Sequence, residues 1–509
     1  MADRALRSIL IVGGGASGWM AATLLNRHLT PARCQITVVE SAAIGILGVG
    51  EATVPPMVAF LRVAGLDEAF FLQACHASFK LGIKFAGWGA PGAPPLWHPF
   101  GLVGGTIDGM PLFHHWLRAR LDGTEALPFD AYSLQAVAGD ALKGPRPAGG
   151  GSPITERGAY AYHLDAREFA TFLHGAATRR GVRHVVDDVL GAELDERGFI
   201  AGVQTRAHGR LEADLYLDCS GFAGLLVGGA LGEPWESWSD WLLCDRALAV
   251  PLESEGEIAP YTLATALPAG WSWRIPLAHR LGTGYVYSSA FASDDEAHRQ
   301  LAAHLGHAPE AIEPRRLRMR VGRRREFWVR NCVAIGLAGG FLEPLESTAL
   351  YLVQVGVEQL IELLPDRDMA PAAAQRYNEL VGAIYAEARD FVLLHYLLNG
   401  RDEPFWRASR APAPPASLAA SLELYDATGS PGWHHNLFRD TSFHAIAAGL
   451  GRLPKRAAPR ATFSNAGQVR EILSSIRARH AAIVRGLPGH AALLREIASA
   501  RAAAPARGA

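Results

Sequence analysis

A glycine-rich segment near the start of the chain constrains the fold more than any other feature. Gly13, Gly15 and Gly18 follow an apolar stretch, residues 7–12, and precede residues 19–27, whose pattern predicts a helix. In this arrangement the first glycine permits a tight turn and the second lets the backbone approach a pyrophosphate. The third lets the helix pack closely on the sheet. The segment therefore predicts a strand, a phosphate-binding turn and a helix whose N-terminus faces the phosphates.

The next predicted strand, residues 35–40, completes a β-α-β unit with a parallel sheet. It ends in Glu40, where a carboxylate typically accepts hydrogen bonds from a ribose. The chain has one such dinucleotide fingerprint, and two further glycine-containing segments follow at 218–221 and 333–340. This spread favours FAD, a long cofactor that contacts several loops, over a nicotinamide dinucleotide.

Composition excludes several other classes of protein. Lys plus Arg numbers 49 and Asp plus Glu 50, so a net charge of −1 leaves no basic surface for nucleic acid. The five cysteines are odd in number and lack CxxC spacing, which argues against a disulfide framework or a zinc site and favours the cytoplasm. Residues 8–26 resemble a signal peptide, but their glycines suit the strand–turn–helix better. No run approaches the roughly 20 apolar residues of a membrane span.

Lysine is rare in this chain, which makes its positions informative. Only four of the 49 basic residues are lysines, and Lys80 and Lys84 both lie in 78–87, whose alternation predicts one strand with both lysines on the same face. An unpaired buried ammonium costs several kcal/mol, so a lysine in so apolar a segment needs a partner or a task. We expect a functional role for Lys80 and a solvated or ion-paired position for Lys84.

The remaining pattern predicts an α/β protein with an FAD-binding Rossmann-type domain like that of flavin monooxygenases, an antiparallel substrate sheet and a mainly helical C-terminal part. Residues 1–350 are expected to form the FAD-binding domain with the sheet inserted. Residues 351–509 are expected to cover the substrate, with about the last ten disordered. The elements expected outside the β-α-β unit are a helix at 57–74, a loop at 143–153, strands within 247–289, helices at 349–364 and 372–397, a linker at 410–417 and helices after 466.

Several motifs together resemble the flavin-dependent tryptophan halogenases. They occur in the family's order over most of the chain, and the WxWxIP element distinguishes these enzymes from related flavin hydroxylases. The motifs are the glycine-rich segment 13–18, GVGEAT at 48–53, Phe79-Lys80, WSWRIP at 271–276 and PLEST at 344–348. The resemblance implies an enzyme of the same fold.

The resemblance also implies the chemistry. FADH2 from a separate flavin reductase would react with O2 to give a flavin C4a-hydroperoxide, which a bound chloride or bromide would attack to form hypohalous acid. Lys80 matches the lysine that receives this acid beside the arene, and Glu346 matches the carboxylate that positions the oxidant or takes the arene proton. Thr348 and Ala349 match the halide site. The residues expected to bind FAD are Gly13, Gly15, Ala16, Ser17, Gly18, Glu40, Gly50, Glu51, Ala52, Thr53, Gly336 and Leu345.

Two of these motifs permit structural interpretations as well. Glu346 precedes a predicted helix, so Ser347 or Thr348 could cap that helix while the carboxylate favours its dipole. Free amides at the same helix terminus are also a physical reason for a halide to bind there. Ala349 stands where the family usually has glycine, which restricts the backbone and predicts a reshaped halide pocket.

The substrate pocket departs from the family pattern. His98, Pro99 and Phe100 match an aromatic wall of the pocket, although a turn with a packed Phe is the alternative. Leu437 and Phe438, after His434-His435-Asn436, stand where a Phe-Trp pair usually clamps the indole, and the segment that grips the amino acid is not recognisable. We therefore expect an electron-rich arene such as indole rather than free tryptophan.

Other assignments remain open from the sequence. The fold and oxygen chemistry also suit an FAD-dependent aromatic hydroxylase, and the departures at Ala349 and in the clamp also suit a degenerate flavin-binding scaffold. Trp271 and Trp273 mark the family and are core aromatics otherwise, and Cys219 and Ser220 suit loop packing rather than nucleophilic catalysis. No metal site is predicted, and the resemblance implies a possible homodimer.

Overall fold

The structure of the chain is a computed structural model. It describes residues 4–43, 50–152, 154, 159–254, 256–433 and 437–502. The predicted motif residues Gly48 and Val49, the pocket residues His434, His435 and Asn436, and the terminal residues 503–509 lie outside this range.

A mainly parallel sheet confirms the β-α-β unit. The strand order is β10-β2-β1-β14-β23-β22, and only β22 pairs antiparallel with its neighbour. β1, β14 and β23 are almost wholly buried, as expected for a parallel sheet covered on both faces. The bounds are Arg183–Val186 (β10), Gln35–Glu40 (β2), Ser8–Val12 (β1), Leu215–Asp218 (β14), Cys332–Ala334 (β23) and Trp328–Val329 (β22).

The helix after the glycine-rich turn is buried on every side. α1 (Ala16–His28) packs on this sheet and against α7 (Ala166–Arg179) and α9 (Ala349–Glu362). Residues 18–26 are all buried because both faces of the helix meet other elements. The helix fixes the turn at residues 13–15 to the rigid centre of the molecule.

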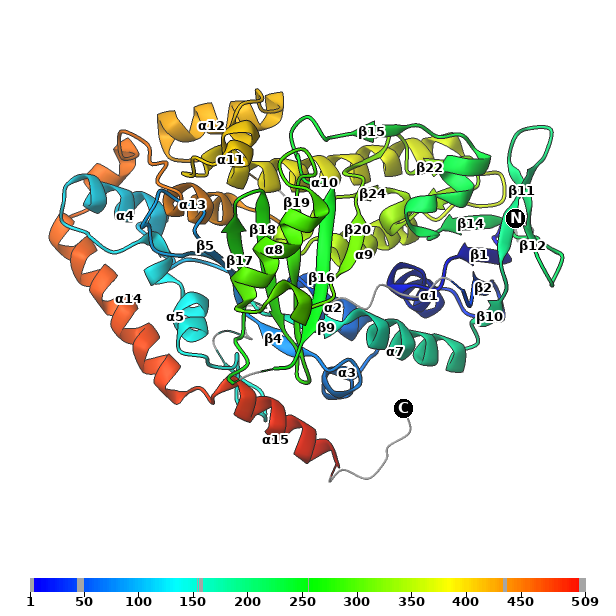
Figure 1. Cartoon of the computed structure of the whole chain (residues 1–509), viewed down its shortest axis with the longest axis horizontal. Helices are drawn as coiled ribbons and strands as arrows, with labels where there is room; N and C mark the ends of the chain where they lie inside the picture. The colour runs from blue at the N-terminus through cyan, green and yellow to red at the C-terminus, as the bar shows by residue number, and fades with distance from the viewer. Residues whose placement is uncertain are drawn as a thin grey trace.

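A seven-stranded, mostly antiparallel sheet forms the middle of the molecule (Figure 1). Its order is β20-β16-β19-β18-β17-β5-β6, and only β17 and β5 pair in parallel. It confirms the strands predicted within 247–289. The bounds are Arg315–Arg318 (β20), Arg246–Leu252 (β16), Leu281–Tyr287 (β19), Gly270–Pro276 (β18), Thr262–Leu267 (β17), Gly82–Ala86 (β5) and Leu96–Pro99 (β6).

The single strand predicted for 78–87 is wrong. β4 (Ser78–Lys80) belongs to a small sheet with β9 (Ala161–Asp165) and β3 (Gly50–Ala52), whereas β5 belongs to the large sheet. The chain changes sheets at Leu81, whose N–H donates to Pro260 O at 2.7 Å. Alternation continues across this break, so hydrophobicity alone did not reveal it.

The break separates the two lysines of this segment. Lys80 lies in the small sheet and is fully buried, whereas Lys84 lies in the large sheet and is half-buried. Lys84 Nζ is 2.6 Å from Asp140 Oδ1, which confirms the predicted ion pair. Only Lys80 therefore remains as a buried lysine that needs another explanation.

The single helix predicted for 57–74 is also two elements. α2 (Pro56–Val63) ends before Gly65, which has a φ of +64°, and α3 (Glu68–Ala74) begins after Asp67. The Asp67 carboxylate accepts a hydrogen bond from Phe70 N at 2.8 Å and caps the second helix. A left-handed glycine followed by a capping residue explains the interruption.

Helices form most of the chain after residue 349. They confirm the long helices predicted at 349–364 and 372–397 and the helices after 466. The predicted domain boundary at 350 falls in the first turn of α9, and the division into two domains stays a prediction. The remaining helices are α10 (Pro371–Leu398), α11 (Pro404–Arg410), α12 (Ala416–Thr428), α13 (Asp440–Gly449), α14 (Ala466–Gly486) and α15 (His490–Ala502).

The C-terminal helices return to the N-terminal half of the chain. α14 packs beside α4 (Leu112–Leu121) and α5 (Leu134–Asp140), along one outer edge of the molecule (Figure 1). α15 follows, and its His490 Nε2 accepts a hydrogen bond from Phe79 N at 3.0 Å. The end of the chain thus supports the strand that carries Lys80.

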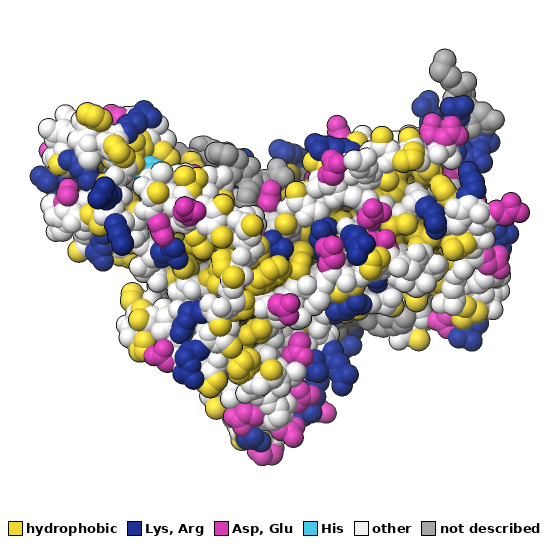
Figure 2. Space-filling view, turned by 90° about the horizontal axis from the view of Figure 1, so that it is seen from above, with side chains coloured by type: hydrophobic (Ala, Val, Ile, Leu, Met, Phe, Trp, Pro, Cys, Tyr) yellow, Lys and Arg dark blue, Asp and Glu magenta, His cyan; other side chains and the backbone are white. Residues whose placement is uncertain are grey.

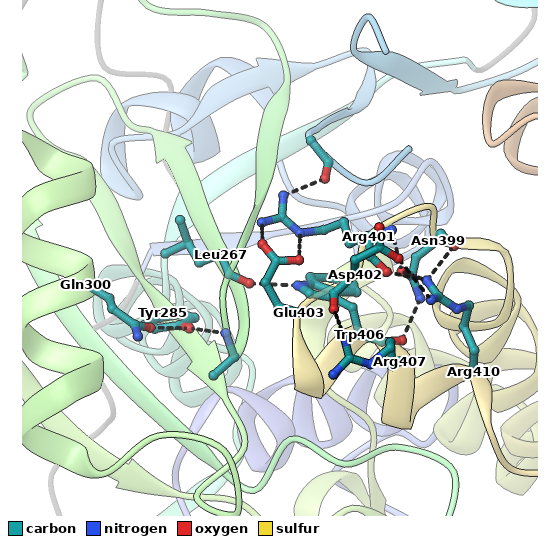
Figure 3. A network of polar contacts seen from close by, with 12 residues as sticks. Leu267, Tyr285, Gln300, Asn399, Arg401, Asp402, Glu403, Trp406, Arg407 and Arg410 are labelled. Carbon is teal, nitrogen blue, oxygen red and sulfur yellow. Dashed lines mark hydrogen bonds and ion pairs between the residues drawn. The ribbon is translucent and has the colours of Figure 1, made fainter. Parts of the chain in front are cut away.

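A polar network fixes the turn between α10 and α11 (Figure 3). Asn399 is its centre: Nδ2 donates to Tyr396 O at 2.6 Å, and Oδ1 accepts from Arg410 Nη1 at 2.7 Å. Trp406 Nε1 donates to Leu267 O at 2.8 Å, which connects α11 to the large sheet. The C-terminal end of α10 is therefore held in a fixed position.

Acidic and basic side chains are intermixed on the face seen in Figure 2, and hydrophobic side chains gather across its middle. The five cysteines all lie in the described range and are buried free thiols. Within that range, no helix is both long and apolar enough to cross a membrane.

Candidate functional site

A cavity of about 780 Å³ opens beside the glycine-rich turn. Its walls include the ends of β1 and β2, the loop after β14 and one face of β18. Cavities at the carboxyl ends of parallel strands are typical ligand sites of such sheets. The predicted cofactor residues that line it are Gly13, Gly15, Ala16, Ser17, Glu40, Gly50, Glu51, Ala52 and Gly336. Gly18, Thr53 and Leu345 do not line it.

Glycine is required at these three positions for different physical reasons. Gly13 has a φ of +114°, and an added Cβ would lie 2.2 Å from Cys219 O. A Cβ at Gly18 would lie 1.8 Å from Gly13 O, so this glycine allows the turn and helix to pack together. A Cβ at Gly15 would meet nothing within 4 Å. Gly15 thus leaves open space at the N-terminus of α1, where a pyrophosphate fits.

Glu40 lies at the end of β2 as predicted and lines the cavity. Its Oε1 is 2.7 Å from His184 Nε2, and His184 Nδ1 is 3.1 Å from His174 Nε2. His184 therefore contacts the carboxylate directly, and His174 contacts His184. Open space at Gly15, a carboxylate for the ribose and an apolar wall with Trp271 and Trp273 fit a flavin dinucleotide.

The loop after β14 is organised by a buried carboxylate. Asp218 accepts hydrogen bonds from Ser220 Oγ at 2.5 Å and from the backbone N–H groups of Leu226 and Val227 at 2.8 and 2.9 Å. Burial raises the pKa of Cys219 well above its ordinary value. Cys219 and Ser220 thus serve loop packing, in agreement with the sequence interpretation.

Lys80 is completely buried at the end of β4. Nζ donates to Ser347 Oγ at 2.8 Å and to Thr53 O at 3.1 Å, and lies 5.1 Å from the centroid of Phe100. Burial lowers the pKa of Lys80 to about 7, although the negative charge of Glu346 opposes the shift. Thr53, predicted to bind FAD, contacts the lysine through its carbonyl oxygen, and its binding to FAD stays a prediction.

Glu346 is completely buried in the 3₁₀ turn Pro344–Glu346. Its Oε2 is 2.7 Å from His98 Nδ1, and its Oε1 is 2.9 Å from His395 Nε2. Burial alone would raise the pKa of this carboxyl, but the two imidazoles beside it, His98 foremost, lower it to about 2. The site therefore holds an ionised carboxylate in the interior.

Ser347 joins the two candidate catalytic residues. It follows Glu346 directly, accepts the hydrogen bond of Lys80 and lines the flavin-type cavity. Its φ of +58° is unusual for a residue other than glycine. Such conformations cluster at functional sites. Lys80 and Glu346 are therefore held on either side of one strained residue at the cavity wall.

The turn continues into α9, where the halide site is expected. Ala349 lines the cavity and Thr348 is buried beside it. Thr348 is the N-cap of α9, but no side chain makes a capping hydrogen bond there. The interpretation of Ser347 or Thr348 as a side-chain cap is therefore wrong, and the first amides of α9 have no side-chain acceptor from this position.

The predicted aromatic residues gather on the other side of Glu346. His98 and Pro99 end β6 and are buried, and the Phe438 ring lies 6.0 Å from the His98 ring. Phe438 is also buried and stacks on Phe391 of α10 at 4.0 Å. Leu437 is half-buried against the core.

Sequence reasoning missed four residues of this region: Glu343, Ser347 as the partner of Lys80, Phe391 and His395. Glu343 had a signal, because it and Glu346 are the only charged residues between Asn331 and Val357. Phe391 and His395 had none, since they lie inside a long helix whose pattern suggests only core packing. Among the described residues, no group of three or more His, Cys, Asp or Glu side chains could hold a metal ion.

Comparisons with known protein families agree with this geometry. The model of the family described as tryptophan halogenase matches residues 8–465. Tryptophan 6-halogenase SttH of Streptomyces toxytricini is 38% identical, over 94% of this chain and 96% of its own. Tryptophan 7-halogenase RebH of Lentzea aerocolonigenes is 36% identical, over 96% of this chain and 98% of its own.

Solved structures are similar over the same extent. BrvH, a flavin-dependent halogenase from Brevundimonas sp. BAL3, has a TM-score of 0.90 and 39% identity, covering 97% of this chain and 99% of that one. The structure of SttH has a TM-score of 0.89 and 35% identity, covering 97% of this chain and 100% of that one.

Proposed function

The chain belongs to the tryptophan halogenase family, and from this premise we propose that Lys80 and Glu346 carry out the halogenation of an indole-like arene. It is a flavin-dependent oxidoreductase with the Rossmann-type fold of that family. Its cofactor is FADH2, supplied by a separate flavin reductase, and it uses a halide and O2 to halogenate an aromatic substrate.

One observation carries the assignment of the two residues. Lys80 and Glu346 are both completely buried, and Ser347 connects them at the wall of the cavity that fits the flavin. A buried ammonium and a buried carboxylate are costly to keep for stability alone. Reduced FAD, when bound, supplies the reaction of O2 and halide that yields hypohalous acid.

Lys80 would act on the hypohalous acid. Nζ donates a hydrogen bond to its oxygen, and the arene carbon forms a bond to the halogen as the halogen–oxygen bond breaks. The departing hydroxide takes a proton from Lys80 and leaves as water. Burial, which lowers the pKa of Lys80 to about 7, makes this proton transfer easier than from an exposed lysine.

Glu346 would complete the substitution. Its carboxylate takes the proton from the halogenated ring carbon and later returns it to Lys80. The low pKa of this carboxyl, about 2, does not prevent the transfer, because a protonated arene is a far stronger acid. The two imidazoles keep the carboxylate ionised and oriented before the substrate reacts. Thr348 and Ala349 would hold the halide at the N-terminus of α9.

The arrangement of aromatic side chains supports indole over free tryptophan. In the Leu437–Phe438 pair only Phe438 carries an aromatic ring. This ring stacks on the ring of Phe391, with the two centroids 4.0 Å apart. A single phenyl ring of this kind forms a smaller clamp than a Phe-Trp pair. The proposal also includes a cytoplasmic location. It further includes a homodimer, which sedimentation velocity tests.

The test is a competition assay. The protein is incubated with FAD, a flavin reductase, NADH, O2, bromide and equal indole and tryptophan, and the products are measured by mass spectrometry. We expect bromoindole to dominate, the Lys80→Ala variant to form at least a hundredfold less, and Lys84→Ala to equal the parent. Equal bromination by Lys80→Ala would refute the role of Lys80. Preferred bromination of tryptophan would refute the substrate, and hydroxyindole without bromoindole would indicate a hydroxylase.

A further inference from the structure

A second buried carboxyl, Glu343, lies just before Glu346 in completely different surroundings. Its Oε2 accepts hydrogen bonds from Tyr396 Oη at 2.9 Å and from Trp271 Nε1 at 3.3 Å. Both donors are neutral, whereas Glu346 faces two imidazoles. The Glu343 side chain is fully shut off from solvent.

The chemistry of this position suits an un-ionised acid. Within the described part of the chain, Oε1 of Glu343 has no hydrogen-bond partner of good geometry, and Cys244 Sγ, 3.7 Å from Tyr396 Oη, is the further polar group beside this carboxyl. Burial raises the pKa of Glu343 to about 7, with only partial compensation from its neutral donors. Glu343 and Glu346, one turn apart, thus differ in charge preference: burial favours the neutral form of Glu343, whereas Glu346 is held ionised. Neighbouring carboxyls that differ in this way typically have different roles.

Trp271 connects Glu343 to the flavin cavity. Its ring lines the cavity and lies 6.3 Å from the ring of Trp273, which lines it too. The indole N–H can only donate, so a buried tryptophan needs an acceptor to fix its ring. Glu343 is that acceptor.

The other donor to Glu343 is fixed independently. The Tyr396 carbonyl accepts a hydrogen bond from Asn399, and its ring stacks on Trp406 at 5.8 Å. Asn399 and Trp406 belong to the network that anchors the turn after α10 (Figure 3). Glu343 therefore lies between an anchored tyrosine and a tryptophan that faces the cofactor.

We propose that Glu343 is a positioning residue of the flavin site, which holds the Trp271 ring against the bound isoalloxazine. It contacts neither substrate nor cofactor and acts through Trp271. This inference depends on flavin binding, which the family membership establishes, and not on Lys80 or the identity of the arene. Its failure is thus distinguishable from failure of the proposed function.

The test measures the bound oxidised flavin rather than turnover. FAD is titrated into the parent and into Glu343→Leu, Glu343→Gln, Trp271→Phe and Tyr396→Phe, and the Kd and the visible spectrum of bound FAD are recorded with each Tm. We expect Glu343→Leu and Trp271→Phe to shift the flavin spectrum alike and to raise Kd by about three- to tenfold, at most about 1.4 kcal/mol. Glu343→Gln keeps an acceptor and should retain the parent values.

Tyr396→Phe is the matched control, because it removes the other donor to Glu343 and leaves Trp271 in place. We expect it to lower Tm while the spectrum and Kd stay at parental values. A parental spectrum and Kd in Glu343→Leu, or an equal spectral change in Tyr396→Phe, would overturn the proposal. If Glu343→Leu fails to fold, Trp271→Phe decides, since an unchanged flavin spectrum in that variant would overturn the proposal as well.

Discussion

His98 Nδ1 lies 2.7 Å from Glu346 Oε2, and both side chains are almost entirely shut off from solvent. His395 approaches the other carboxylate oxygen from α10 at 2.9 Å. The two imidazoles come from a strand and a helix far apart in the sequence, and they offset the cost of burying a charge. They orient the carboxylate from two sides and keep it ionised.

Replacing His98 should therefore change the acidity of Glu346. His98→Gln removes an imidazole that lowers the pKa of Glu346 while the burial remains, so this pKa should rise from about 2. The acidic limb of the kcat–pH profile should move to higher pH, and the rate at pH 5 should fall up to about twofold more than at pH 8, because loss of one such partner raises the pKa of a carboxyl like this to at most about 5. Steady-state halogenation from pH 5 to pH 9 measures this effect.

The control for this variant is His115→Gln in α4. His115 is also buried, but its Nε2 bonds to Ile107 O and it does not contact Glu346. It should leave the acidic limb unchanged. A His98→Gln profile that falls by the same factor at every pH would show that His98 does not control the charge of Glu346.

Lys80→Met should stabilise the protein while it abolishes halogenation. The pKa of Lys80 falls from 10.5 to about 7 on folding because the side chain is buried, so its charge opposes folding. Methionine fills similar space without a charge and should raise Tm by about 1–3 °C near neutral pH. Differential scanning calorimetry measures this gain.

The pH dependence of that gain has a definite sign. Below pH 7 Lys80 is protonated in both the folded and the unfolded state, so the cost is complete. Between about pH 7 and 10.5 only the unfolded state is protonated, and the cost disappears as the pH rises. The Tm difference between Lys80→Met and the parent should thus shrink toward pH 10, and a constant difference would contradict the low pKa.

Local signals predicted the glycine-rich turn and the helix after it well. Gly13, Gly15 and Gly18 each lie where glycine is required for the reason that their spacing predicted. The prediction succeeded because a turn and a helix N-terminus are local structures. The apolar segment around Lys80 predicted its burial, which the structure confirms, and the rarity of lysine in this chain made that position informative. Its position could not be derived fully, since the change of sheet at Leu81 depends on a hydrogen bond to Pro260, far along the chain.

The surroundings of Glu346 depend on long-range contacts that no periodicity encodes. His395 and Phe391 follow the apolar pattern of α10, and only the packing of that helix brings them to Glu346 and Phe438. His98 was predicted as part of a substrate wall, whereas the structure shows that it contacts a carboxylate. Such pairing requires knowledge of which surfaces meet in three dimensions.

Two glycine substitutions should separate cofactor binding from folding. Gly15→Ala places a methyl group in open space, so Tm should stay within about 2 °C while the Kd for FAD rises at least tenfold. Gly18→Ala forces a methyl group within 1.8 Å of Gly13 O and should lower Tm sharply. Fluorescence titration with FAD and thermal melts measure the two effects. If both variants bind FAD as tightly as the parent, a pyrophosphate at this turn is excluded.

The last prediction concerns the small aromatic clamp. Phe438→Leu keeps an apolar side chain but removes the ring that stacks on Phe391. Because such ring contacts contribute about 1 kcal/mol, KM for indole should rise about fivefold while kcat changes less than twofold. Steady-state bromination with indole measures both constants.

The matched control is Phe443→Leu in α13. Phe443 is also buried, but its ring lies 5.0 Å from the rings of Tyr425 and Trp433. It should lower Tm and leave KM for indole unchanged. Equal KM values in the two leucine variants would mean that the ring of Phe438 serves packing alone, and the arene must then be recognised by other groups around His98. A KM that rises only in Phe438→Leu would establish this ring as the clamp, because Phe443→Leu also removes a buried aromatic ring.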